Sequence, residues 1–508
     1  MPAGSNKAVI IGGGIGGLAT AILLAKQGCQ VSLYEKLDSL GGRARQFKAK
    51  GFTFDMGPSW YLMPRIFEHF FELIDEDINR HLRLTRLKPG YKVFYENCPP
   101  LTIAGDLARD MHTFESIESG AGEALRRYVH RAENTYKTAA DSFLYTNFNS
   151  YGGFLKPRVL KSGPFMALSA AKSIDSYVSS YVRDQRLKQI LEYPVVFLGA
   201  SPYKAPALYH LMSYMDFEEG VFYPQGGMYE IISALIKLAK KHGVTLHTGT
   251  GVKAINVSQG RANSITLEDD TCLPADLVIS NADLHHSETA LLAPQYQTYP
   301  PKYWQKRTNG PSAMLLYLGI KGKLPQLEHH NLYFTDKWRA NFKAIFDDKT
   351  WPDPASMYVC KPSATDPSVA PAGHENIFIL VPLPARKLSA KQQAGLAARY
   401  LRQFKMMINE PDLDKRIVFK RVYGPNDFEA DYNSWQGSAL GLSHTLRQSA
   451  WLRPANKSKK VSNLYYVGGN TIPGIGLPMC LIGAELIVKH LAGDKSNAPL
   501  KWLPKDKK

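Results

Sequence analysis

The sequence predicts a two-domain α/β protein, in which a discontinuous Rossmann-like nucleotide-binding domain is interrupted by a mixed α+β domain. With 508 residues, the chain is longer than one typical core accommodates. A buried strand, a glycine-rich turn and an apolar helix follow one another from Lys7. Further short apolar strands occur near residues 244–255, 277–280 and 464–467, and we expect them to share one sheet with the first.

The composition is that of an ordinary globular protein with a basic surface. Hydrophobic residues make up 44% and charged residues 21% of the chain, which gives no sign of extended disorder. The formal net charge of +17 favours an anionic partner. Because no zinc-finger spacing or aromatic-basic platform for single strands occurs, we expect no nucleic acid. An anionic membrane surface is the predicted partner.

Cysteine usage and hydropathy indicate the compartment. The five cysteines are far apart and form no Cys-x-x-Cys pair, which argues against a metal site and a disulfide framework. Residues 474–493 are apolar, but Pro478, Glu485 and Lys489 argue against a membrane-spanning helix. We therefore predict a cytoplasmic protein that binds the inner face of the membrane peripherally.

The glycine-rich turn has the form of a dinucleotide-binding site. Gly12 permits a tight turn, Gly14 lets the backbone approach a pyrophosphate, and Gly17 allows the helix to pack closely. Glu35 ends the next strand, where its carboxylate can accept hydrogen bonds from ribose hydroxyls. This motif does not distinguish NAD from FAD.

A second glycine pair narrows the choice of nucleotide. Its residues are Gly41, Gly42 and Arg43, and the turn Gly57, Pro58 and Ser59 follows. Together with the first motif, they resemble the large flavoprotein group of the glutathione-reductase type (GR2). The resemblance implies FAD as the cofactor, with the glycine pair and Arg43 around its diphosphate and the later turn beside the flavin. Two glycines and a guanidinium suit that task physically.

The same resemblance extends to later segments. It implies that the main chain at Val252 contacts adenine, and that Gly469 and Asn470 follow a returning strand on the flavin side. A helix that begins near Pro478 and Met479 would direct its positive end toward the flavin ring.

Other blocks resemble the bacterial and fungal phytoene desaturase family across almost the whole chain. They are residues 220–227, 279–283, 365–373, 437–439 and 448–454. The resemblance implies FAD-dependent desaturation of a hydrophobic isoprenoid, a phytoene-like C40 carotenoid precursor, by hydride transfer to flavin N5 and proton loss. It also covers C30 dehydrosqualene or diapocarotenoid desaturases and related isomerases and oxygenases.

One departure from the family pattern leaves the reaction type open. The family's usual Thr-His-Pro-Gly run is Thr471-Ile472-Pro473-Gly474 here, so the histidine is missing. A flavin oxidoreductase acting on an amine or a small ring remains an alternative. So does a non-catalytic prenyl-lipid-binding protein of the same fold, although such proteins lack the complete FAD fingerprint.

The motif order predicts how the chain is divided. We expect the FAD-binding domain to comprise residues 1–90, 225–300 and 455–493, the substrate domain residues 91–224 and 301–454, and a basic tail residues 494–508. The sequence does not indicate an oligomeric state.

Catalytic side chains are poorly marked, because no triad or paired-carboxylate spacing occurs. Arg158, Glu218 and Glu219 are weak candidates. The pairs His285-His286 and His329-His330 are expected to be surface or capping residues. Residues 155–190 combine basic and apolar side chains, including Tyr177 and Val178, and predict an amphipathic helical patch for an anionic leaflet.

Overall fold

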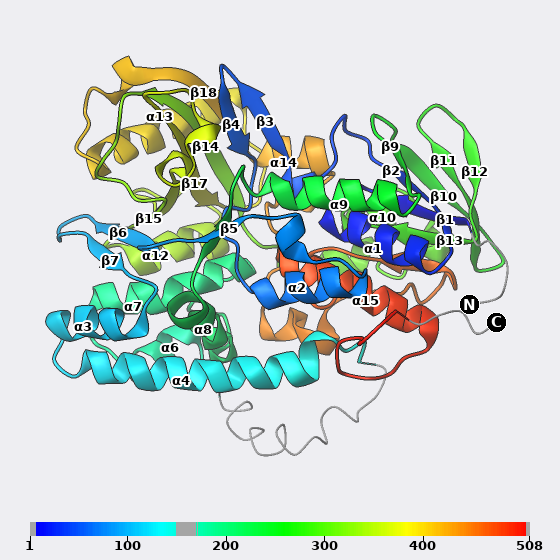
Figure 1. Cartoon of the computed structure of the whole chain (residues 1–508), viewed down its shortest axis with the longest axis horizontal. Coiled ribbons are helices and arrows are strands. Elements are labelled where there is room, and N and C mark those ends of the chain that lie inside the picture. The colour runs from blue at the N-terminus through cyan, green and yellow to red at the C-terminus, as the bar shows by residue number, and fades with distance from the viewer. Residues whose placement is uncertain (1–6, 149–168, 170, 504–508) are drawn as a thin grey trace.

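The computed structural model describes residues 7–148, 169 and 171–503 (Figure 1). A five-stranded sheet and both ends of the chain lie on the right of Figure 1, and a seven-stranded sheet lies on the left above a layer of helices. Arg158 and residues 155–168, the first part of the expected amphipathic patch, lie outside the described residues.

The five-stranded sheet is parallel and has the order β19-β13-β1-β2-β9. Its strands are β1 (Lys7–Ile11), β2 (Gln30–Tyr34), β9 (Thr245–His247), β13 (Leu277–Ser280) and β19 (Leu464–Tyr466). In β1, Ile10 lies between Ile279 and Leu33. Such apolar strands are buried on both faces, as parallel sheets require. The Rossmann-like fold is therefore confirmed, with strands from three distant segments.

Helices cover this sheet. They are α1 (Ile15–Lys26), α2 (Pro64–Leu73), α9 (Tyr229–Lys241) and α15 (Leu477–Ala492), with α10 (Leu284–Thr289) and α11 (Pro301–Trp304) nearby. Helix α1 packs against both α9 and α15. The Lys489 ammonium of α15 is fully buried, and it donates to the carbonyls of Tyr145, Ser496 and Ala498. These bonds satisfy a charge that would otherwise be costly to bury.

One predicted strand segment divides between two sheets. Residues 245–247 join the parallel sheet as β9, whereas Val252 begins a separate antiparallel sheet. That sheet consists of β10 (Val252–Ser258), β11 (Arg261–Leu267) and β12 (Cys272–Pro274). The expectation of one shared sheet is wrong for residues 252–255, because Gly249 and Gly251 lie in the turn between the two strands.

The seven-stranded sheet has the order β18-β14-β17-β16-β15-β6-β7. Its strands are β6 (Tyr91–Tyr95), β7 (Leu101–Ile103), β14 (Ser312–Lys321), β15 (His330–Phe334), β16 (Met357–Cys360), β17 (His374–Leu383) and β18 (Ile417–Tyr423). Only the β6 and β15 pair is parallel among these seven strands. Two segments of the chain that are more than 200 residues apart thus meet at this pair.

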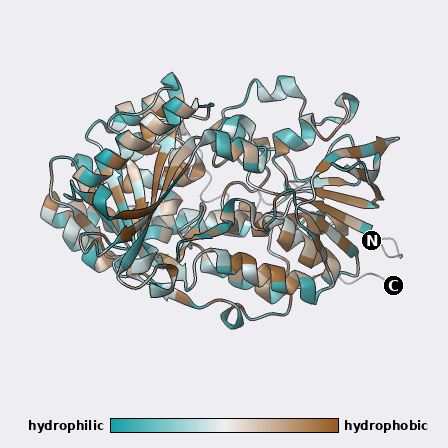
Figure 2. Cartoon of the chain, turned by 90° about the horizontal axis from the view of Figure 1, so that it is seen from above, coloured by the Kyte–Doolittle hydropathy of each residue, from teal (hydrophilic) through white to brown (hydrophobic). Residues whose placement is uncertain are grey.

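The helices of this region are mostly short. They are α3 (Leu107–Ile117), α4 (Ala121–Ala139), α6 (Ile174–Val178), α7 (Gln185–Glu192), α8 (Met212–Tyr214), α12 (Trp338–Lys343), α13 (Ala390–Met407) and α14 (Pro425–Tyr432). Hydrophobic residues gather along the inner strands and the inner faces of the helices (Figure 2). In α6, Tyr177 and Val178 are buried in the core. They do not face a membrane, so this part of the predicted patch is wrong.

Two antiparallel ribbons connect the regions. They are β3 (Gln46–Ala49) with β4 (Phe52–Asp55), and β5 (Leu84–Arg86) with β8 (Phe222–Pro224). Phe54 and Phe47 of the first ribbon pack against Tyr317 of β14, which fixes the ribbon on the seven-stranded sheet. Across the described residues, the helices are all too short or too polar to span a bilayer.

Candidate flavin and substrate site

The first glycine turn joins β1 to α1 without room for side chains. Gly12 has φ +96, and a Cβ on Gly17 would lie 2.2 Å from the carbonyl oxygen of Gly12. The carboxylate of Glu35, at the end of β2, accepts a hydrogen bond of 2.7 Å from the backbone N–H of Gly13. This turn therefore presents bare backbone at the start of a helix, with a buried carboxylate behind it.

The second glycine turn lies against the first. Gly41 has φ +117 and forms a bridge with Gly14, and Gly42 has φ +55. Both residues adopt the left-handed region, which favours glycine. Arg43 follows, and its guanidinium donates to the Ser434 hydroxyl at 3.0 Å while its buried Nε has no hydrogen-bond partner among the described residues.

These residues fit the diphosphate and ribose of FAD. Two turns without side chains provide a close backbone approach, the N-terminus of α1 faces the same place, and Arg43 supplies a positive charge. Of the Glu35 carboxylate oxygens, each already accepts one backbone N–H, and each retains capacity for a ribose hydroxyl. When bound, FAD would supply the redox chemistry.

A cavity of about 1010 Å³ begins beside this turn and extends to the seven-stranded sheet. Arg43, Gly57, Pro58 and Ser59 line one end of it, and the first residues of α15, including Pro478 and Met479, line the same cavity. The N-terminus of α15 therefore borders the cavity and brings a partial positive charge to it. The remaining wall is mainly aromatic and aliphatic, from residues such as Trp60, Phe197, Leu315, Phe334 and Leu380.

Two other predicted contacts hold the C-terminal loop. Asn470 donates to the Asp283 carboxylate at 3.0 Å and accepts from the N–H of Leu442 at 2.8 Å. The carbonyl of Gly469 accepts from the buried Arg453 guanidinium. Neither residue lines the large cavity. Their observed bonds fix the loop that carries Ile472 and Pro473, which do line it.

Of the weak catalytic candidates, Glu218 and Glu219 lie within the described residues. Glu218 and Glu219 belong to a π-helical turn, Met215–Glu219, and neither lines the cavity wall. Partial desolvation raises the pKa of both carboxyls, and Glu218 is the more exposed of the two residues. Their geometry assigns them no contact with a substrate in this cavity. Arg158 lies outside the described residues.

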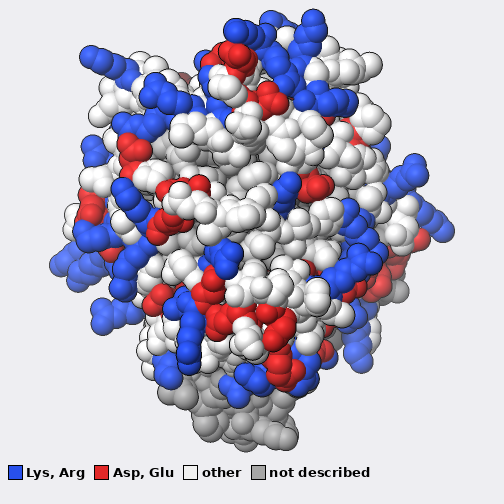
Figure 3. Space-filling view, turned by 90° about the vertical axis from the view of Figure 1, so that its left-hand side faces the viewer, with Lys and Arg blue, Asp and Glu red and all other residues white. Residues whose placement is uncertain are grey.

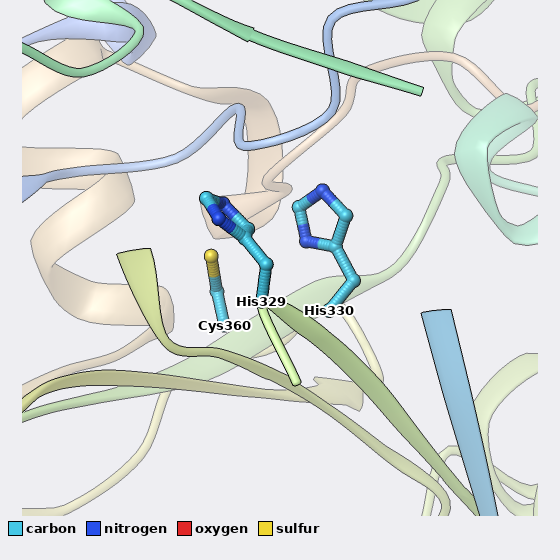
Figure 4. Close-up of side chains that lie close together, drawn as sticks. All are labelled: His329, His330 and Cys360. Carbon is cyan, nitrogen blue, oxygen red and sulfur yellow. The ribbon is translucent and has the colours of Figure 1, made fainter. Parts of the chain in front are cut away.

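The pair His329 and His330 is buried, so the expectation of surface residues is wrong for this pair (Figure 4). Both rings and the Cys360 thiol lie close together beside β15 and β16, with one possible ligand atom of each within 4.8 Å of the others. His329 Nδ1 is hydrogen-bonded to the hydroxyl of Thr365, and His330 Nδ1 is hydrogen-bonded to the hydroxyl of Tyr358. Burial raises the pKa of the Cys360 thiol to about 12, so it is not a preformed anionic ligand.

Sequence reasoning missed His444, which lies among the residues that line the large cavity. Its ring lies where a side chain on Gly474 would be, because Cε1 and Nε2 are each 2.4 Å from a Cβ built there. The sequence shows that the family histidine is missing at Ile472, two residues earlier, but no local pattern marked His444.

Comparisons with known proteins show which family the chain is similar to. A family model described as flavin-containing amine oxidoreductase matches residues 15–485. The chain is 40% identical to a carotenoid 3,4-desaturase of Haloarcula japonica, over 96% of this chain and 98% of the relative. It is 34% identical to a zeta-carotene-forming phytoene desaturase of Myxococcus xanthus, over 96% and 94%. An oxidoreductase structure from Methanosarcina mazei, 18% identical, has a TM-score of 0.61 and covers 95% of this chain and 100% of its own.

Proposed function

The chain belongs to the flavin-containing amine oxidoreductase family, as a member of its carotenoid desaturases, and we propose that it desaturates a C40 carotenoid precursor. The cofactor is FAD, and the enzyme acts on CH–CH bonds. The substrate class follows from the relatives, whereas its chain length is the proposed part. We also propose that FAD is held by Gly12, Gly14, Gly17 and Glu35 of the first motif, and by the other residues of the predicted set: Gly41, Gly42, Arg43, Gly57, Pro58, Ser59, Val252, Gly469, Asn470, Pro478 and Met479.

The observation that carries this proposal is the apolar cavity. Its volume of about 1010 Å³ is at the upper end of the range for ligand pockets, about 300–1,000 Å³. Among the described residues that line it there is no Asp, Glu or Lys, and Arg43 at the nucleotide end supplies the charge. Such a wall would hold a long hydrocarbon and exclude water, but it offers no anion to an amine substrate.

The protein's contribution to the reaction would be positioning. Aromatic walls from Trp60, Tyr193 and Phe197 would hold the polyene, while the Gly57–Ser59 turn and the start of α15 border the end where the flavin would lie. Bound FAD would supply the acceptor for a hydride, and loss of a proton from the adjacent carbon would complete the double bond.

Exposed apolar side chains at the cavity wall support the proposal of peripheral membrane binding. Three large apolar side chains at the cavity wall are also exposed to solvent: Leu446 (54%), Trp451 (59%) and Leu452 (45%). We propose that this exposed rim, defined by Leu446, Trp451 and Leu452, inserts into the lipid surface and admits the substrate. On the face in Figure 3, basic and acidic side chains are interspersed, so that view gives no large basic patch for an anionic leaflet.

Co-expression tests the substrate assignment. Cells that make phytoene and cells that make dehydrosqualene would each receive the protein, and the pigments would be separated and identified by absorbance and mass. Longer conjugated products in the C40 cells support the proposal. Products in the C30 cells alone would assign the C30 alternative instead, and unchanged precursor in both would contradict the assignment.

A further inference from the structure

The cavity contains few groups that could take up a proton. Desaturation releases one proton from carbon, and a positioned base is the usual acceptor. Among the described residues of the cavity wall, the titratable side chains are Arg43, His444, Tyr136, Tyr193, Tyr209 and Tyr358. Burial raises the pKa of all four tyrosines, so they remain protonated and cannot accept. His444 remains.

The hydrogen bonds of His444 fix which ring nitrogen carries the N–H and which carries the lone pair. The Tyr209 hydroxyl donates to the Ser449 hydroxyl at 2.7 Å, and Ser449 donates to the carbonyl of Thr445. Tyr209 has therefore used its proton, and its oxygen accepts the N–H of His444 Nδ1 at 3.0 Å. The lone pair then lies on Nε2, which accepts a long hydrogen bond of 3.4 Å from the backbone N–H of Ile475.

The surroundings keep this ring neutral. Burial and the nearby guanidinium of Arg453 hold the pKa of His444 well below its usual range. Arg453 is buried and donates to backbone carbonyls, including that of Thr471. Tyr209 and Arg453 are the titratable groups that face the imidazole from neighbouring segments. At neutral pH, His444 is therefore uncharged, and its Nε2 lone pair is held only by the long hydrogen bond from the Ile475 N–H, which a proton would displace.

We propose that Nε2 of His444 accepts the proton lost by the polyene, which makes it a catalytic residue of the proposed desaturation. The C–H bond of one allylic carbon breaks, and its electron pair leaves as hydride to the flavin. The C–H bond of the adjacent carbon also breaks, its electron pair forms the new π bond, and its proton bonds to Nε2. Two electrons thus pass from the polyene to the flavin.

A weak base suffices for this step. A carbon beside a centre that is losing hydride is far more acidic than an ordinary C–H. The hydride also adds negative charge near the cavity, and a nearby negative charge favours the protonated imidazole. The imidazole fits at this position because residue 474 is glycine. Any side chain at residue 474 would overlap the ring of His444.

The test compares the wild-type holoenzyme with His444→Ala and His444→Asn. The Asn amide can still donate to Tyr209, so it preserves packing and orientation while it removes the base. His490→Ala, a half-buried histidine on α15 away from the cavity, is the matched control. FAD content is measured first, and then the anaerobic rate at which one equivalent of substrate polyene reduces the bound flavin.

We expect normal FAD content and flavin reduction at least 100-fold slower in both His444 variants, within the range for loss of a general base. Added imidazole should restore part of the rate in His444→Ala. A rate in His444→Asn within threefold of wild type would overturn the proposal. Because it rests on the proposed function, a wild-type enzyme inactive on every polyene would instead reject that function.

A second readout does not depend on turnover. Each proton taken up with the electron pair changes the flavin midpoint potential by about 30 mV per pH unit. If His444 holds a proton when the flavin is reduced, the slope of potential against pH should be steeper in wild type than in His444→Asn by that amount. Equal slopes would overturn the proton-accepting role, even if the variant were slow.

Discussion

A Cβ placed on Gly42 would lie 3.2 Å from the Cα of Gly14, so the two glycine turns are in contact through bare backbone. Residues 14 and 42 come from separate motifs, and the parallel sheet brings them together. Their contact defines the place where the proposed FAD diphosphate would lie.

Gly42→Val should therefore weaken FAD binding at least tenfold. Gly42 has φ +55, where a β-branched residue is strained by about 1–2 kcal/mol, and its side chain would press on Gly14. Titration of the apoprotein with FAD, followed by flavin absorbance, measures the affinity. Gly395→Ala is the control, because Gly395 is exposed on α13 with open space around it. Unchanged FAD affinity in Gly42→Val would contradict the assignment.

Ala313→Phe should block the substrate cavity while FAD remains bound. Ala313 on β14 is buried and lines the cavity, so a benzyl group there would fill space meant for the polyene. We expect kcat/KM to fall at least tenfold, with about 1–3 kcal/mol of destabilisation from overpacking. Ala397→Phe overpacks a core away from the cavity and controls for stability. If both variants lose activity equally, the cavity is not the substrate site.

Asp216→Asn should change how stability depends on pH. Burial raises the pKa of Asp216 to about 7, although Tyr91 and Tyr193 donate to its carboxylate. Between its unfolded pKa near 3.8 and about pH 7, the folded state binds the proton and the unfolded state does not. The contribution of Asp216 to stability thus falls as pH rises through this range.

Asn stays neutral and can accept both tyrosine hydrogen bonds. The free energy of unfolding of Asp216→Asn should therefore rise relative to wild type between pH 4 and pH 7, by on the order of 4 kcal/mol. Urea unfolding at several pH values measures this difference. A difference that is constant with pH would show that Asp216 is ionised in the folded protein throughout.

The double variant Trp451→Ser, Leu452→Ser should reduce membrane binding. Both side chains are exposed at the cavity wall, and their removal takes apolar area away from the proposed lipid contact. Flotation with neutral and with acidic liposomes measures the bound fraction, which we expect to fall at least fivefold. Trp502→Ser removes an exposed tryptophan that does not line the cavity. An equal fall in that control would place the contact elsewhere.

Local sequence patterns predicted the glycine turns and the start of the last helix. The glycines at 12, 14, 41 and 42 are marked by conformation and close approach, and the helix starting near Pro478 is marked by proline in its first turn. These features depend on neighbours in the chain. The fold could therefore be predicted from local sequence, whereas the choice of FAD over NAD came from the resemblance of the second glycine pair to a flavoprotein group.

Long-range packing could not be predicted in the same way. Residues 474 and 444 are thirty positions apart, and the place of His444 beside Gly474 depends on tertiary contacts. His329 and His330 read as polar residues but become buried where β15 enters the seven-stranded sheet. From the sequence, Tyr177 and Val178 were predicted to face a membrane. They are buried instead, because they pack against residues from distant segments of the chain.

Desaturation of a polyene by the bound flavin can be measured by anaerobic mixing of the FAD-loaded protein with phytoene in liposomes. We expect the oxidised-flavin absorbance to be lost and one new double bond to form for each flavin reduced. A flavin that dithionite reduces, but that stays oxidised with phytoene and with other C40 or C30 polyenes, would show that the protein is not a carotenoid desaturase.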